Sequence, residues 1–175
     1  KHIKPSCNIL EVGCGTGKLL KQIDGLALNI RLTGVEMSKD MLNKINRSEF
    51  VNELNLINSA VENFTSDETY DIIVMKQVLH HTVSREMVLE KLCDQLNCKG
   101  VIIIMTPNEG YQKGIIGFNQ KSDPLGRISD SMINNYVKKL PLYVEKIQHV
   151  NTVAKFSSLY EYFMFLYSIG SLQKI

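Results

Sequence analysis

The sequence lacks a strong excess of either charge. Its 20 Lys and Arg residues against 18 Asp and Glu leave a net charge of +2, and the basic residues are scattered rather than clustered. A balance of this kind produces no basic field large enough to indicate nucleic-acid binding. The sequence also lacks an apolar run of membrane-spanning length, and no signal segment precedes the first predicted strand. We therefore expect neither nucleic acid nor membrane as a partner.

The cysteines do not indicate a metal site or a disulfide framework. The four cysteines stand at positions 7, 14, 93 and 98, without the paired spacing of a metal site. We expect reduced thiols in a cytoplasmic chain, with no metal bound. The 175 residues, 44% of them hydrophobic and 22% charged, suit one globular domain.

A glycine-rich segment, Asn8–Gly17, is the most informative feature that is present. It reads N-I-L-E-V-G-C-G-T-G, an apolar strand that ends at a glycine turn, and a helix is expected over Lys18–Ile23. Glycines at alternate positions allow a ligand to approach the backbone closely, and a helix start offers unpaired N–H groups. This arrangement holds a nucleotide-like cofactor in open α/β sheets, although a turn without a ligand is the alternative interpretation.

The spacing of the loop narrows the choice of cofactor. The third glycine comes one residue too early for the dinucleotide pattern G-x-G-x-x-G, and Lys18 is wrongly spaced for a phosphate-binding P-loop. Glu11 would repel a pyrophosphate but suits a ligand that carries an ammonium group. The pattern E-x-G-x-G-x-G resembles the first motif of class I S-adenosylmethionine (SAM) methyltransferases. This resemblance implies a Rossmann-like, doubly wound α/β fold, with a mostly parallel sheet and helices on both faces. It also implies SAM as cofactor, bound through Glu11, Gly13, Cys14, Gly15 and Gly17.

Further segments follow at the spacing of that family. A second strand, Arg31–Val35, ends at Glu36, which we expect to accept hydrogen bonds from both ribose hydroxyls. Met37 is expected to lie against the adenine. The run Ser38–Leu42 resembles the family's continuation into a second helix.

The third motif departs from the family pattern. Where relatives commonly have D-A-E, this chain has Ser59, Ala60 and Val61. A serine hydroxyl accepts a hydrogen bond from the adenine amino group more weakly than a carboxylate does. Glu62, one position later, is a candidate to compensate. Ser59, Ala60 and Val61 are all predicted to contact the cofactor.

A histidine pair follows the fourth predicted strand, Asp71–Met75. The segment Lys76-Gln77-Val78-Leu79-His80-His81 resembles the family's "vLhH" element beside the methyl-donor sulfur, with Lys76 and Gln77 at the cofactor. Adjacent histidines cannot point the same way. We expect His81 to face the acceptor, where it could serve as a general base, and His80 to be structural.

The remaining pattern completes an alternation of strands and helices. A helix is expected over Ser84–Leu96, a glycine turn over Asn97–Gly100 and a strand over Val101–Met105. These close the predicted core, residues 8–106. Residues 107–175 are expected to add substrate-side elements to one domain that covers 1–175. They comprise an irregular stretch (Asn108–Ile128), a helix capped by Ser129 or Asp130, a strand (Tyr143–Val153) and an aromatic helix (Ser158–Ile169).

The last part of the chain weakly resembles the malonyl-[acyl-carrier-protein] O-methyltransferases. Both ends are short for the family, so either the chain is trimmed or the N-terminal cap and the final antiparallel strand are reduced. The expected activity is methyl transfer to a small molecule or to a carrier-bound acyl group, and the oligomeric state is left open. The alternatives are a tRNA or rRNA methyltransferase, and a SAM-binding scaffold without activity.

Overall fold

A computed structural model describes residues 3–26, 29–111, 123, 126–150, 157–158 and 161. Strands and helices largely alternate in the part described. They follow in the order β1 (Asn8–Val12), α1 (Lys18–Asp24), β2 (Arg31–Glu36), α2 (Lys39–Leu42), the 3-10 helix η1 (Arg47–Glu49), β3 (Glu53–Asn58), β4 (Tyr70–Lys76), the 3-10 helix η2 (Leu79–His81), α3 (Arg85–Asp94), β5 (Leu96–Met105) and α4 (Asp130–Val137).

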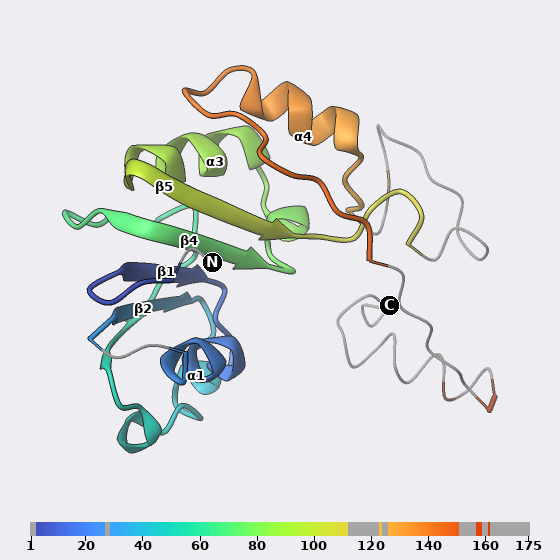
Figure 1. Ribbon diagram of the computed structural model, residues 1–175. Coiled ribbons are helices and arrows are strands. Elements are labelled where there is room, and N and C mark those ends of the chain that lie inside the picture. The colour runs from blue at the N-terminus through green and yellow to red at the C-terminus, as the bar shows by residue number, and fades with distance from the viewer. Residues whose placement is uncertain are drawn as a thin grey trace. The chain divides into compact units, whose positions relative to one another are not determined.

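The strands form one sheet in the order β3-β2-β1-β4-β5, in which every pairing is parallel. The chain builds outward from β1 through β2 and β3, and then returns to place β4 on the other side of β1 (Figure 1). Ligands of open α/β sheets bind at such a switch point, beyond the carboxyl ends of the strands. The predicted fold class is thereby confirmed. The expected ligand site lies at the carboxyl ends of β1, β2 and β4.

Each face of the sheet has its own apolar core. Helices α3 and α4 lie over one face and α1 over the other (Figure 1). Residues of β1 alternate between the cores: Leu10 and Val12 join the α3 side, whereas Ile9 packs with Leu20 of α1. All five residues of β1 are buried, as expected of a central parallel strand.

The expected glycine turn at Asn97–Gly100 is wrong. Helix α3 ends at Asp94 and β5 already begins at Leu96, where it pairs with Tyr70. The extra residues form an irregularity in the β4–β5 ladder before pairing resumes between Ile72 and Val101. Lys99, rather than Gly100, takes the left-handed conformation, with φ of +67°. Pairing with β4 thus outweighs the local turn preference.

Helix α4 follows the prediction closely. Its N-cap is Ser129, whose hydroxyl accepts a hydrogen bond from the Met132 N–H at 3.3 Å. Met132, Ile133 and Tyr136 then pack against the core on the α3 side.

The chain divides into two compact units, Lys1–Tyr143 and Val144–Ile175. In the second unit, residues 144–150 contain no strand, so the strand expected from Tyr143 is wrong as far as Val150. The Ser158 hydroxyl accepts from the Glu161 N–H at 3.2 Å, as a capping box requires. Most of the helix expected after it, and most of Asn108–Ile128, lie outside the described residues.

Candidate functional site

The glycine loop between β1 and α1 has the backbone that its sequence predicts. Gly13, Gly15 and Gly17 are all left-handed, with φ of +70°, +55° and +75°. An added Cβ at Gly13 would stand 2.2 Å from Val78 Cγ2, whereas at Gly15 it would meet only Met41 Sδ, at 3.8 Å. Gly17 is the N-cap of α1 and provides no side-chain cap. The loop therefore requires glycine for its conformation and leaves open space at its crest.

The Glu36 carboxylate is fixed beside this loop. Its Oε2 accepts from the Gly15 N–H at 3.0 Å, and its Oε1 accepts from the Ser38 N–H at 2.8 Å. Each carboxylate oxygen has two acceptor positions, so each retains one for another donor. The carboxylate is thus held in position but is not saturated.

Glu11 is the least satisfied polar side chain of the loop region. It is only 3% exposed, and its Oε2 is buried without a hydrogen-bond partner. Burial raises its pKa to about 7, against the opposing effects of the Leu20 backbone N–H and of Lys76. A cation placed against this oxygen would relieve the cost of its burial.

The charges of both carboxylates act on the Cys14 thiol. Burial, together with the charges of Glu11 and Glu36, raises its pKa to about 12. The thiol therefore remains protonated and is not a nucleophile. Its role in the loop is that of a small buried side chain.

Methionines flank the glycine loop. Met37 is 74% exposed directly after Glu36, and Met41 is also exposed. Soft, polarisable thioethers of this kind make favourable contacts with aromatic rings. Met41 and Val78 were missed as site residues, because only the folded backbone brings them against the glycines.

The Ser59–Val61 segment lies beside Glu36 through its backbone. The Ser59 N–H donates to the Glu36 carbonyl at 3.1 Å, and the Ser59 hydroxyl donates to the Ala60 carbonyl at 2.9 Å. The Val61 side chain is buried in the core, so only its backbone remains for a ligand. The Glu62 carboxylate, a candidate to compensate for Ser59, instead accepts a hydrogen bond from the Val83 N–H at 3.4 Å.

Asn58 is a residue that the sequence reading missed. Its amide donates to the carbonyls of Glu36 and Met37, both at 2.9 Å. It thus fixes the backbone on either side of the Glu36 carboxylate. An amide residue at the last position of a strand is the signal that could have revealed it.

Lys76 and Gln77 close β4 at the same edge of the sheet. Both are exposed, and Gln77 is left-handed, with φ of +59°. The Gln77 N–H donates to the Met105 carbonyl at 2.8 Å, which holds this conformation. A left-handed conformation in a residue other than glycine is uncommon and is typical of functional sites.

The histidine pair divides into a half-buried and an exposed ring. His81 is exposed, whereas the Nδ1 of His80 is buried without a partner. The two ring centroids lie 3.9 Å apart. Burial, together with the charges of the neighbouring His81 and Arg85, lowers the pKa of His80 to about 4. His80 is therefore neutral at physiological pH.

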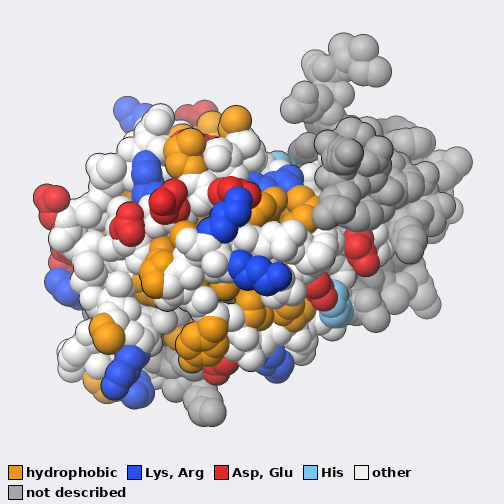
Figure 2. All heavy atoms as spheres, turned by 90° about the horizontal axis from the view of Figure 1, so that it is seen from above, with side chains coloured by type: hydrophobic (Ala, Val, Ile, Leu, Met, Phe, Trp, Pro, Cys, Tyr) orange, Lys and Arg blue, Asp and Glu red, His pale blue; other side chains and the backbone are white. Residues whose placement is uncertain are grey.

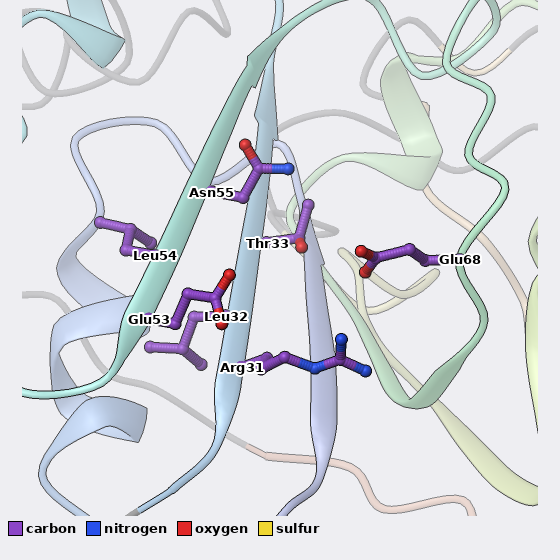
Figure 3. A pocket seen from close by; sticks show the side chains of 7 residues that line it. All are labelled: Arg31, Leu32, Thr33, Glu53, Leu54, Asn55 and Glu68. Carbon is purple, nitrogen blue, oxygen red and sulfur yellow. The ribbon is translucent and has the colours of Figure 1, made fainter.

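A polar cavity of about 200 Å³ lies elsewhere, against β2, β3 and the segment before β4 (Figure 3). It is lined by Arg31, Leu32, Thr33, Glu53, Leu54, Asn55 and Glu68. Arg31 and Glu53 open their strands, so the cavity lies toward the amino ends. It is therefore separate from the carboxyl-end site. Within the described ranges, no group of His, Cys, Asp and Glu could hold a metal ion. No described helix is long and apolar enough to cross a membrane.

Comparison with known proteins identifies the family. A family model described as a methyltransferase domain matches residues 3–162, so the chain belongs to this methyltransferase family. The predicted family, that of the SAM-dependent methyltransferases, is confirmed. S-adenosylmethionine is the family's cofactor.

Individual relatives are distant. A malonyl-[acyl-carrier protein] O-methyltransferase of Bacillus cereus is 25% identical over 94% of this chain and 64% of its own length. An (S)-tetrahydroprotoberberine N-methyltransferase of Eschscholzia californica is 31% identical over 52% of this chain and 27% of its own. Among solved structures, the plantazolicin methyltransferase BpumL, with a substrate analogue and S-adenosylhomocysteine (SAH), superposes with a TM-score of 0.66. The match has 23% identity and covers 78% of this chain and 56% of BpumL, and it supports the fold. The chain thus spans less than two thirds of the length of these relatives.

The residues at the carboxyl edge fit SAM chemically. The unpartnered oxygen of Glu11 suits an ammonium group. The open acceptor positions of Glu36 suit ribose hydroxyls, and the exposed Met37 suits an aromatic base.

Proposed function

We propose that this chain transfers a methyl group from SAM to a small molecule or to a carrier-bound acyl group. The observation that carries the proposal is the buried, unpartnered Glu11 oxygen beneath a left-handed three-glycine loop at the switch point of the sheet. In this proposal Glu11 binds the ammonium group and Glu36 binds the ribose. Met37, Ser59, Ala60 and the Val61 backbone contact the adenine, while Cys14, Lys76 and Gln77 line the same site.

SAM supplies a methyl group that is already activated by the sulfonium. The protein's task is then chiefly to align the acceptor with that methyl group and to exclude water. A carboxylate or phenolate acceptor needs no base. An alcohol or amine acceptor is helped by one, and His81 is the accessible imidazole at the end of β4.

The distribution of charge supports an acceptor other than nucleic acid. On the face shown in Figure 2, Lys and Arg side chains are interspersed with Asp and Glu and with apolar side chains. Nucleic-acid interfaces instead gather positive charge along one face. The similarity to a malonyl-[acyl-carrier protein] O-methyltransferase supports a carrier-bound acyl acceptor.

A transfer assay with methyl-labelled SAM tests the proposal. The acceptor panel contains a malonyl-carrier-protein thioester, free carboxylic acids, phenols, amines and bulk tRNA. We expect label in a small molecule or in the carrier thioester. Label in tRNA, with binding that weakens steeply with salt, would instead favour an RNA methyltransferase. SAM binding without transfer, together with a co-purifying partner protein, would favour a scaffold.

A further inference from the structure

We propose that Arg127 is a positioning residue that holds the histidine pair at the carboxyl end of β4 through Gly126 and Arg85. This inference rests on the proposed function, since the pair matters only if the acceptor binds beside it. No motif of the sequence assigns a role to Arg127, which falls in a stretch that reads as irregular.

The Arg127–Asp123 ion pair is almost entirely buried. Their side chains are 0% and 4% exposed, and the Arg127 Nε donates to Asp123 Oδ1 and Oδ2 at 3.1 and 3.0 Å. The Arg127 backbone N–H donates to Asp123 Oδ2 at 2.8 Å, and its Nη1 donates to the Tyr111 carbonyl at 2.8 Å. Burying an ion pair is costly unless its hydrogen bonds are complete. This pair is well hydrogen-bonded, and the bond from Arg127 to the Tyr111 carbonyl links it to the start of the segment after β5.

Gly126, next to Arg127, is pressed against η2. It is left-handed, with φ of +62°, and an added Cβ would stand 2.5 Å from the His80 carbonyl oxygen. The Gly126 carbonyl accepts from Arg85 Nη2 at 3.2 Å, and the same nitrogen lies 3.5 Å from the His80 carbonyl. Arg85 therefore bridges Gly126 and His80. The ion pair acts on the histidines through this bridge.

The imidazole rings have little else to hold them. The His80 Nδ1 has no hydrogen-bond partner, so packing and the tether on its backbone carbonyl fix this ring. The His81 ring rests on the His80 ring at 3.9 Å between centroids. A shift of Gly126 would therefore move both rings.

A purely structural ion pair is the competing explanation, and histidine titration separates the two. Protein with isotope-labelled histidine is followed by NMR against pH, with Arg127→Gln as the variant. Lys139→Gln is the matched control, because it breaks the exposed pair between Glu86 of α3 and Lys139 in the turn after α4. In the native protein the His80 pKa lies well below its ordinary value, since the ring is half-buried beside His81 and Arg85. We expect Arg127→Gln to raise this pKa by about one unit or more, toward that of an exposed imidazole, and Lys139→Gln to leave it unchanged.

A second variant keeps the test decisive if Arg127→Gln does not fold. Gly126→Ala leaves the ion pair intact but presses a methyl group against the His80 carbonyl, and it should shift the same titration. An unchanged His80 titration in a folded variant, with only a lower melting temperature, would overturn the inference.

Calorimetry with SAH, run in parallel, separates the two proposals. Affinity should agree within about twofold between native protein and Arg127→Gln, because Arg127 touches no part of the proposed cofactor site. Native protein that binds no SAH would overturn the proposed function, whatever the histidines do. SAH binding with an insensitive histidine pair would overturn this inference alone.

Discussion

The β1–β2 side and the β4–β5 side of the sheet hold their functional groups by different means. On the β1–β2 side, backbone groups do the holding: the Gly15 and Ser38 N–H groups fix Glu36, and the loop conformation requires glycine. On the β4–β5 side, the side chains of Arg85 and Arg127 donate to the carbonyls of Gly126 and Tyr111, which are 41 and 16 residues away in sequence. We infer that the first side is specified by local sequence, and the second by packing that must form before the site exists.

Gly13→Ala should have the largest effect. The new methyl group would meet Val78 Cγ2 at 2.2 Å, and φ at this position is +70°. We expect a loss of stability of about 1–3 kcal/mol and a loss of SAH binding of at least about tenfold, measured by thermal unfolding and calorimetry. Gly25→Ala is the control, because Gly25 has φ of −75° and its nearest neighbouring atom would lie at 3.7 Å. Equal effects at both positions would contradict a special requirement at Gly13.

Glu36→Ala should follow in size. It removes the acceptor that orders Gly15 and Ser38, and it also removes the proposed ribose contact. Binding of SAH should weaken by about 1–3 kcal/mol, the scale for hydrogen bonds to a charged group. Glu53→Gln, at the opposite end of the neighbouring strand, should leave the affinity unchanged. An unaltered affinity in Glu36→Ala would exclude Glu36 from the site.

The titration of Glu11 should change the stability of the protein by a smaller amount, gradually with pH. Its pKa is raised from 4.5 to about 7, so between these values the folded protein binds a proton that the unfolded chain does not. Without ligand, the free energy of unfolding should therefore fall by up to about 1.4 kcal/mol per pH unit as pH rises from about 4.5 to about 7. Above about pH 7 it should level off.

Ligand binding should show the opposite trend. An ammonium group requires ionised Glu11, so SAH should bind more tightly as pH rises toward about 7, with release of a proton. Calorimetry in buffers of different ionisation enthalpy measures that proton. In Glu11→Gln this part of the pH dependence should disappear. Its persistence would assign the proton to another group.

Met37→Ala should have the smallest effect of the four. The side chain is 74% exposed, so its loss should leave folding unchanged. We expect SAH affinity to fall by about 0.3–1.5 kcal/mol, the range of sulfur–aromatic contacts. Calorimetry provides the measurement. A fall in melting temperature without change in affinity would show that Met37 is structural.

The difference between the two sides of the sheet also explains which features could be predicted from the sequence. The glycine loop, Glu36 and the Ser129 cap are local patterns, and the structure has each at the expected place. The turn at Asn97–Gly100 failed because pairing between Tyr70 and Leu96 overrides local preference.

The contacts on the β4–β5 side could not be predicted from the sequence. The Arg127–Asp123 pair lies in a stretch rich in glycine, where no periodicity marks a buried ion pair. The His80 carbonyl lies against Gly126, which is distant in sequence from β4. Only the folded chain contains this information.

Titration of the native protein with SAH, with NAD as the comparison ligand, decides whether the glycine loop is built for SAM. We expect saturable binding of one SAH per chain and no binding of NAD, because Glu11 repels a pyrophosphate and Gly13–Gly17 lacks the dinucleotide spacing. A folded sample that binds NAD, or that binds no SAH, would contradict it.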